Sequence, residues 1–259
     1  MQLPNEDGAF YNVPFADYLA WPLWSQSTIK EARKSAAHAK AAREFKAEPT
    51  DAMILGTALH LAFLEPEDAR EKIVTWAGKV RRGKEWDEFR SLYQDKIIHT
   101  VNQTEQLAGM MQAMLASPFI KEISALISDV EITEIGQVCG LRCKGRADAL
   151  VGKTGYDIKK VADADPWKFQ KAIIDYGYDI QGAMYCELFE LDRYILIAVE
   201  DDPPHDVVPY EFSGAMLRNG RLKLEACAAV ILQAEKTGLW PGRSASPVLL
   251  DPPEYDLMG

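Results

Sequence analysis

The sequence is poor in the features that mark secreted proteins. It has four cysteines in 259 residues, and its opening residues lack the basic segment and the following apolar segment of a secretory signal. We therefore expect reduced, mostly buried thiols instead of a disulfide framework. An iron–sulfur cluster is the lesser alternative, because the spacing matches no common ligand pattern. The four residues are Cys139, Cys143, Cys186 and Cys227.

Long apolar runs and a surplus of positive charge are also missing. No run approaches the roughly 18 uninterrupted apolar residues of a membrane span, so a cytoplasmic protein without membrane contact is expected. The formal net charge is −10, which argues against a surface that binds nucleic acid indiscriminately. Any contact with DNA must be local. Carboxylates that hold metal ions add negative charge, so the acidic total does not exclude a phosphodiesterase.

With 47% apolar and 26% charged residues, the chain can bury a substantial core. We expect one domain over residues 1–259, with a helical part at about 25–118, a sheet with helices at about 129–238 and an extended tail at 239–259. Helices followed by strands and further helices indicate an α/β (α+β) fold, in which helices flank a small central mixed β-sheet.

Apolar periodicity and turn residues indicate where the elements lie. Thr28 and Glu31 form a capping-box pattern at the start of a helix, and Asp165-Pro166 is typical of another helix start. Residues 78–100 are polar and irregular, which predicts a mobile surface segment. The expected helices cover about 28–45, 51–64, 103–116, 165–190 with an interruption at Gly177, and 213–238. The expected strands cover about 130–151 as a hairpin, 156–160, 193–200 and 207–212.

Basic residues alternate along the predicted strand that leads to Asp148. Side chains two residues apart point to the same face of a strand, so these residues form a local basic strip on the face of Asp148. The strip could supply the DNA contact that the net charge otherwise disfavours. Its members are Arg142, Lys144 and Arg146.

On the next strand Asp157 and Lys159 also share a face, with Ile158 directed into the core. Magnesium is held by carboxylate and carbonyl oxygens, so Asp148, Asp157 and the carbonyl of Ile158 could supply three ligands and leave water positions open. A metal there would lower the pKa of a bound water and neutralise charge on a phosphate. Lys159 could orient that water or stabilise the developing charge. Taken alone, Asp-x-Lys is equally consistent with a solvated salt bridge.

Three ordered motifs strengthen the metal interpretation: Gly145-x-x-Asp148, Asp157-Ile-Lys159 and Gln181-x-x-x-Tyr185. In this order they resemble the RecB-like branch of the PD-(D/E)XK nuclease superfamily, and the chain is more closely similar to the nuclease domain of phage-type exonuclease VIII (RecE). Further supporting stretches, within about residues 20–190, are Ser25-x-Ser27-x-x-Lys30, Ser35-Ala-Ala-His38, Gly56-Thr-Ala-Leu-His60-Leu-Ala-Phe-Leu-Glu65-Pro66-Glu67, Gly83-Lys84-Glu-Trp86 and Asp175-Tyr-Gly-Tyr178.

The resemblance implies a restriction-endonuclease-like core and a set of roles. Gln181 and Tyr185 would help to position DNA or the catalytic strand. The implied metal ligands are His60, Asp148 and Asp157, beside the Ile158 carbonyl. The implied catalytic residues are Asp148, Asp157, Lys159 and, in a supporting acidic role, Glu131.

Each weaker candidate has an alternative reading from the residues alone. His60 on a buried helix could be a hydrogen-bonded core histidine, and Glu131 could be a strand-surface carboxylate paired with a basic neighbour. Gln181 and Tyr185 could be buried polar packing. Three basic residues after Gly78 could clamp a phosphate or be merely solvated. They are Arg81, Arg82 and Lys84.

The resemblance also implies an activity. We expect a Mg²⁺-dependent deoxyribonuclease, with Mn²⁺ able to substitute, that digests linear double-stranded DNA from 5′ to 3′ and leaves 3′ overhangs for phage-type recombination. Such enzymes commonly act as homo-oligomeric rings on DNA ends, beside a single-strand annealing protein, in a bacterial or phage-infected cell. The rival hypotheses are an endonuclease or repair- or defence-complex subunit with the same site, and a catalytically silent DNA-binding or assembly module.

Overall fold

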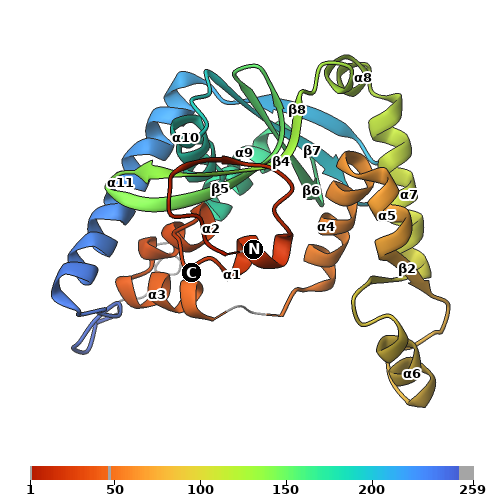
Figure 1. Cartoon of the computed structure of the whole chain (residues 1–259), viewed down its shortest axis with the longest axis horizontal. Helices are drawn as coiled ribbons and strands as arrows, with labels where there is room; N and C mark the ends of the chain where they lie inside the picture. The colour runs from red at the N-terminus through yellow and green to blue at the C-terminus, as the bar shows by residue number, and fades with distance from the viewer. Residues whose placement is uncertain (1, 46–47, 251–259) are drawn as a thin grey trace, which may run out of the picture.

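A six-stranded mixed β-sheet forms the centre of the molecule (Figure 1). The strands are β1 (Gly8–Phe10), β2 (Ile73–Trp76), β3 (Ile97–Thr100), β4 (Asp129–Val138), β5 (Leu141–Val151), β6 (Thr154–Val161), β7 (Arg193–Glu200) and β8 (Val207–Glu211). The sheet has the order β1-β4-β5-β6-β7-β8, and all neighbours are antiparallel except β6 and β7. β2 and β3 form a separate parallel pair. The computed structural model describes residues 2–45 and 48–250.

Helices cover both faces of this sheet. They are α1 (Phe15–Ala20), α2 (Gln26–Ile29), the 3-10 helix η1 (Lys30–Arg33), α3 (Ala36–Glu44), α4 (Asp51–Leu64), α5 (Pro66–Lys72), α6 (Lys84–Leu92), α7 (Val101–Ala116), α8 (Pro118–Ser124), α9 (Pro166–Tyr176), α10 (Tyr178–Leu188) and α11 (Gly214–Thr237). Within the described ranges, none of these helices has the length and apolar character needed to cross a membrane.

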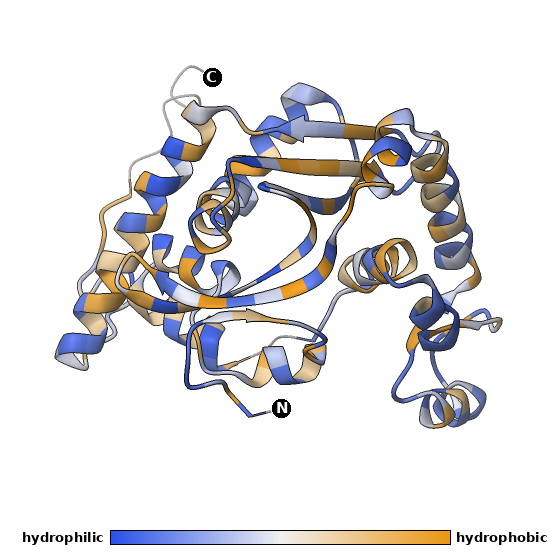
Figure 2. Cartoon of the chain, turned by 45° about the horizontal axis from the view of Figure 1, so that its top comes forward, coloured by the Kyte–Doolittle hydropathy of each residue, from blue (hydrophilic) through white to orange (hydrophobic). Residues whose placement is uncertain are grey.

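Each face of the sheet has its own apolar core. On one face Met184 of α10 and Leu224 of α11 pack together, and on the other Leu59 of α4 packs with Met110 of α7. Alternate residues of β7 enter the two cores, which explains why this strand is a continuous apolar run. Each such buried side chain contributes roughly 1.5–3 kcal/mol. Figure 2 shows hydrophobic residues along the central strands and mostly hydrophilic ones on α6.

Most of the expected elements are present, and two agree to the residue: α4 over 51–64 and β7 over 193–200. The single helix expected over 28–45 is wrong, because Ser35 caps a new helix by accepting a hydrogen bond from the His38 amide. The capping box in this region is formed by Ser25 with Thr28, not by Thr28 with Glu31. All four cysteines are free thiols, as expected.

The prediction that residues 78–100 form a mobile, irregular surface segment is wrong. It contains α6 and β3, and α6 projects from the body of the molecule (Figure 1). Trp76 at the end of β2 packs against Trp86 and Phe89, with ring centroids 5.5 and 5.0 Å away. The aromatic residues lie three apart on α6 and so share one face, which holds the helix in place. Part of the tail expected after residue 238, residues 251–259, lies outside the described ranges.

His99 on β3 generates a prediction about stability. It is fully buried, and within residues 2–45 and 48–250 neither ring nitrogen has a hydrogen-bond partner. Burial, together with the charge of Arg81, lowers its pKa to about 4, whereas the unfolded chain has about 6.5. The unfolded state therefore binds the proton first, so stability is lost as the pH falls from about 6.5 toward 4.

Between pH 7 and pH 4, protonation of His99 in the unfolded state should lower the unfolding free energy of the parent by about 2–3 kcal/mol. The variant His99→Leu should lack this part of the loss. Urea unfolding of parent and variant at both pH values measures this difference. An equal loss in the two proteins would contradict the prediction.

Candidate metal centre

The centre begins where β5 and β6 separate. Their ladder runs from Val151 opposite Thr154 to Ala149 opposite Tyr156. At the next position the Asp148 side chain replaces a backbone partner, because its Oδ2 accepts a hydrogen bond from the Ile158 amide at 2.8 Å. The carboxylate is thus fixed between the two strands and is 8% exposed.

Helix α4 brings His60 to the same point. His60 Nδ1 lies 3.2 Å from Asp148 Oδ2, and Nε2 lies 2.7 Å from the carbonyl oxygen of Ile158. Both partners accept hydrogen bonds, so both ring nitrogens donate and the ring is an imidazolium. Burial opposes this charge, but the charge and hydrogen bond of Asp148 outweigh it and raise the pKa of His60 to about 9. The same pair lowers the pKa of Asp148 despite its burial.

Glu131 enters from β4. The register places it opposite Asp148, since its neighbours pair with Ala149 and Ala147, and its φ of 50° is in the left-handed region that non-glycine residues rarely adopt. Arg146 Nε donates to Glu131 Oε2 at 2.5 Å. Burial and the charge of Asp148 raise the pKa of Glu131. Ligand atoms of Glu131, Asp148 and His60 lie within 4.8 Å of one another.

Asp157 and Lys159 lie beside this cluster, on the face of β6 that meets α10. Asp157 is 2% exposed, its Oδ1 accepts a hydrogen bond from Gln181 Nε2 at 2.6 Å, and its Oδ2 forms an ion pair with Lys159. Burial raises the pKa of Asp157. For Lys159, burial is outweighed by the charges of Asp157 and Asp148, which raise the pKa of the ammonium.

The donor set fits a hard divalent cation. One imidazole and two carboxylates converge within 4.8 Å, and the Ile158 carbonyl lies in hydrogen-bond contact with the same imidazole. Oxygen donors with one imidazole suit magnesium or manganese better than a thiophilic metal. The imidazolium proton now lies between Asp148 and His60, and a metal ion would replace it. The oxygens of Asp157, another predicted ligand, contact Gln181 and Lys159, and metal ligation by this carboxylate stays a prediction.

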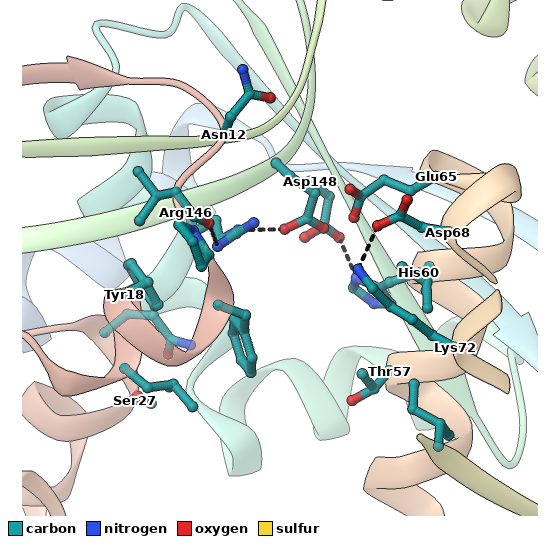
Figure 3. A pocket seen from close by; sticks show the side chains of 18 of the residues that line it. Asn12, Tyr18, Ser27, Thr57, His60, Glu65, Asp68, Lys72, Arg146 and Asp148 are labelled. Atoms are coloured by element: carbon teal, nitrogen blue, oxygen red, sulfur yellow. Dashed lines mark hydrogen bonds and ion pairs between the residues drawn. The ribbon is translucent and has the colours of Figure 1, made fainter. Parts of the chain in front are cut away.

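A cleft of about 800 Å³ opens over these groups. Figure 3 shows Tyr18 and Ser27 on one side of it, Thr57 and Asp68 on the other, and Arg146 and Asp148 between them. Helices α4 and α5 form one wall and the N-terminal segment with α1 forms the other. No sequence motif predicted the second wall, although the aromatic residues of the opening segment were a signal. Its lining residues include Asn12, Val13, Pro14, Phe15, Tyr18 and Leu19.

The basic strip predicted on β5 is not an exposed surface. Arg142 pairs with Asp7 at 2.8 Å, and Lys144 is 5% exposed and donates to the carbonyl oxygens of Tyr18 and Trp21 at 2.5 and 2.7 Å. Burial under the N-terminal segment makes the prediction of DNA contact wrong for Lys144. Arg142 is partly exposed beside Asp7, and its DNA contact stays a prediction. The third, Arg146, does line the cleft.

Of the other predicted DNA-binding residues, Tyr185 lines the cleft and the remaining four are not among its lining residues. Arg81 is turned inward to Asp51 and Gln103, at 2.5 and 2.7 Å, while Arg82 and Lys84 are exposed at the start of α6. Gln181 and Tyr185 are 3% and 5% exposed. Gln181 contacts Asp157 and Tyr185 contacts the backbone of Arg146, as a role in positioning the catalytic strands requires. Contact of either residue with DNA stays a prediction.

Tyr185 provides a test of that positioning role. Its hydroxyl donates to the Arg146 carbonyl at 2.9 Å and accepts from the Arg146 amide at 3.3 Å, two residues before Asp148. We predict that Tyr185→Phe lowers the unfolding free energy by about 1–2 kcal/mol, since two buried backbone groups lose their partner. The matched variant Tyr176→Phe, at a 60% exposed position, should change it by less than about 0.5 kcal/mol. Urea unfolding measures both changes. Equal losses of unfolding free energy in the two variants would contradict the positioning role of Tyr185.

Solved structures are similar to this chain to different degrees. A provisionally named exonuclease from Eubacterium rectale is 17% identical with a TM-score of 0.65, over 99% of this chain and 98% of that chain. A phage-related exonuclease from Haemophilus somnus 129PT is 14% identical with a TM-score of 0.36, over 71% and 95%. LHK-Exo in complex with dAMP is 13% identical with a TM-score of 0.38, over 84% and 94%.

The likeness to the Eubacterium rectale structure covers nearly the whole of both chains, and it confirms the predicted α/β fold with a central sheet and flanking helices. No curated protein matches the sequence significantly. The model of the family described as a PDDEXK-like domain of unknown function (DUF3799) matches residues 25–247, so the chain belongs to this family.

Proposed function

We propose that the protein is a divalent-metal-dependent deoxyribonuclease that hydrolyses phosphodiester bonds in the cleft above Asp148. The observation that carries this proposal is the convergence of His60, Glu131 and Asp148 within 4.8 Å, beside a buried Asp157–Lys159 pair. The metal site and the Lys159 ammonium lie side by side. Together they can stabilise the negative charge of the nucleophile and the negative charge of the phosphate. The candidate ligands would hold a metal that activates the nucleophile, and the Lys159 ammonium would stabilise the negative charge that develops on the phosphate.

His60, Glu131, Asp148 and the Ile158 carbonyl would hold the metal, which when bound supplies Lewis acidity and lowers the pKa of water. Lys159 carries a proton at neutral pH, because its pKa is raised. In this state it can act as a hydrogen-bond donor to the phosphate or the attacking water. Asp157, held by Gln181, keeps the ammonium in position.

The finer activity follows the family resemblance. We propose Mg²⁺ as the metal, linear double-stranded DNA as the substrate, 5′-to-3′ digestion from the end, and assembly as a homo-oligomeric ring that works with a single-strand annealing protein. The exposed cations Arg82 and Lys84 on the projecting α6 segment are the proposed phosphate contacts outside the cleft, together with Arg146 inside it. Closed-circle digestion would favour the endonuclease alternative.

Asp148→Asn tests the centre directly. Loss of the charge removes a metal ligand and the partner of His60, so we expect cleavage of linear duplex DNA in Mg²⁺ or Mn²⁺ to fall about 100-fold or more. The control Asp175→Asn changes an exposed carboxylate paired with Lys171 and should retain parental activity. A parent that leaves linear DNA intact, or an Asp148→Asn protein as fast as the parent, would falsify the proposal.

Lys159→Met separates charge stabilisation from metal binding. We expect cleavage to slow by about 10²- to 10³-fold, while calorimetric titration still detects manganese binding. Its neighbour Lys160 pairs with Asp201 instead, so Lys160→Met should cut within a few-fold of the parent. Absence of manganese binding to the parent would support the silent module. Similar cleavage rates for the two lysine variants would contradict the proposed catalytic role of Lys159.

A further inference from the structure

The N-terminal wall of the cleft exposes apolar side chains beside a polar centre. Phe15 opens α1 and is 56% exposed, and Leu19, one turn later, is 36% exposed. Both line the same cleft as His60 and Asp148. Aromatic surface that stays exposed inside a cleft is available to a ligand with an apolar face.

The wall is fastened firmly to the sheet. α1 has only six residues, so most of its carbonyl groups have no partner within the helix. Lys144 Nζ donates to the carbonyls of Tyr18 and Trp21 at 2.5 and 2.7 Å, and Arg146 Nη1 donates to that of Val13 at 2.9 Å. The cations of β5 thus hold α1 in place, and the ring of Phe15 stands on a fixed support.

One guanidinium connects this ring to the candidate metal ligands. Arg146 Cζ lies 5.7 Å from the centroid of Phe15, and Arg146 Nε donates to Glu131 at 2.5 Å. Glu131 is itself within 4.8 Å of the ligand atoms of Asp148 and His60. The ring and the metal ligands are therefore separated by one side chain, a separation that a single nucleotide can span.

We propose that Phe15 is a stacking platform for the base next to the scissile phosphate, and that the cleft accepts a nucleic-acid strand whose base at this point is unpaired. Aromatic rings bind single strands by stacking, which every base permits. A base inside a duplex has both faces covered by its neighbours and cannot stack on a protein ring. On a linear duplex the base that meets Phe15 is the terminal one, after it has left its partner. This inference rests on the proposed nuclease function.

Fluorescence tests the stacking without cleavage. A single-stranded oligonucleotide with hydrolysis-resistant phosphorothioate linkages carries 2-aminopurine at each of its first four positions in turn, and stacking on a ring quenches the probe. The parent and Phe15→Trp should quench it most strongly at one position. Phe15→Ala should lose that quenching, while Trp167→Ala, at an 80% exposed position outside the cleft, should keep it.

Kinetics test whether the stacked base matters for cleavage. With an unmodified strand, Phe15→Ala should lower kcat/KM by about 5- to 100-fold. With an abasic site at the position found by fluorescence, the parent and Phe15→Ala should cut equally. The parent alone should already prefer the normal strand over the abasic one, which keeps the test valid if Phe15→Ala does not fold.

The outcomes separate this inference from the nuclease proposal. If the parent cuts no DNA but Phe15-dependent quenching persists, the nuclease proposal fails and the stacking platform stands. If the parent cuts normal and abasic strands equally well, or Phe15→Ala quenches like the parent, the stacking platform is wrong and the nuclease proposal is unaffected.

Discussion

The Asp148 carboxylate accepts the Ile158 amide hydrogen and faces the His60 imidazolium, and through these two contacts it joins β5, β6 and α4. Both backbone polar groups of Ile158 take part. Its amide donates a hydrogen bond to Asp148, and its carbonyl oxygen accepts one from His60. Strand separation, helix position and the convergence of the candidate ligands all depend on this side chain. The same carboxylate therefore connects two strands and a helix, and it is also one of the three candidate metal ligands.

The buried charges around Asp148 come in compensating sets. Glu131, Asp148 and Asp157 are faced by Arg146, His60 and Lys159 in three direct ion pairs. Burying ion pairs is weakly stabilising at best and often less favourable than apolar packing. A fold selected only for stability would not need this arrangement. Under the proposed function the arrangement has a chemical purpose, because a divalent cation would take the place of the His60 proton beside Asp148.

Local chemistry in the sequence was sufficient for the elements with strong signals. The pair Asp165-Pro166 at a helix start and the apolar run of β7 predicted their elements well. Alternation correctly put Arg142, Lys144 and Arg146 on one face, but it could not reveal that another segment covers that face. Proximity of His60 to Asp148 joins residues 88 positions apart and came from the resemblance. The Phe15 wall was missed because an exposed aromatic residue has no local pattern.

The fastening of α1 by Lys144 bears on where the folding unit begins. The family match starts at residue 25, yet β1 completes the sheet edge against β4, and the acceptors of the Lys144 ammonium lie at Tyr18 and Trp21. A protein cut at the family boundary would keep the cation and lose these acceptors, with one strand edge uncovered. The folded unit therefore includes β1 and α1, which precede the stretch that sequence comparison recognises.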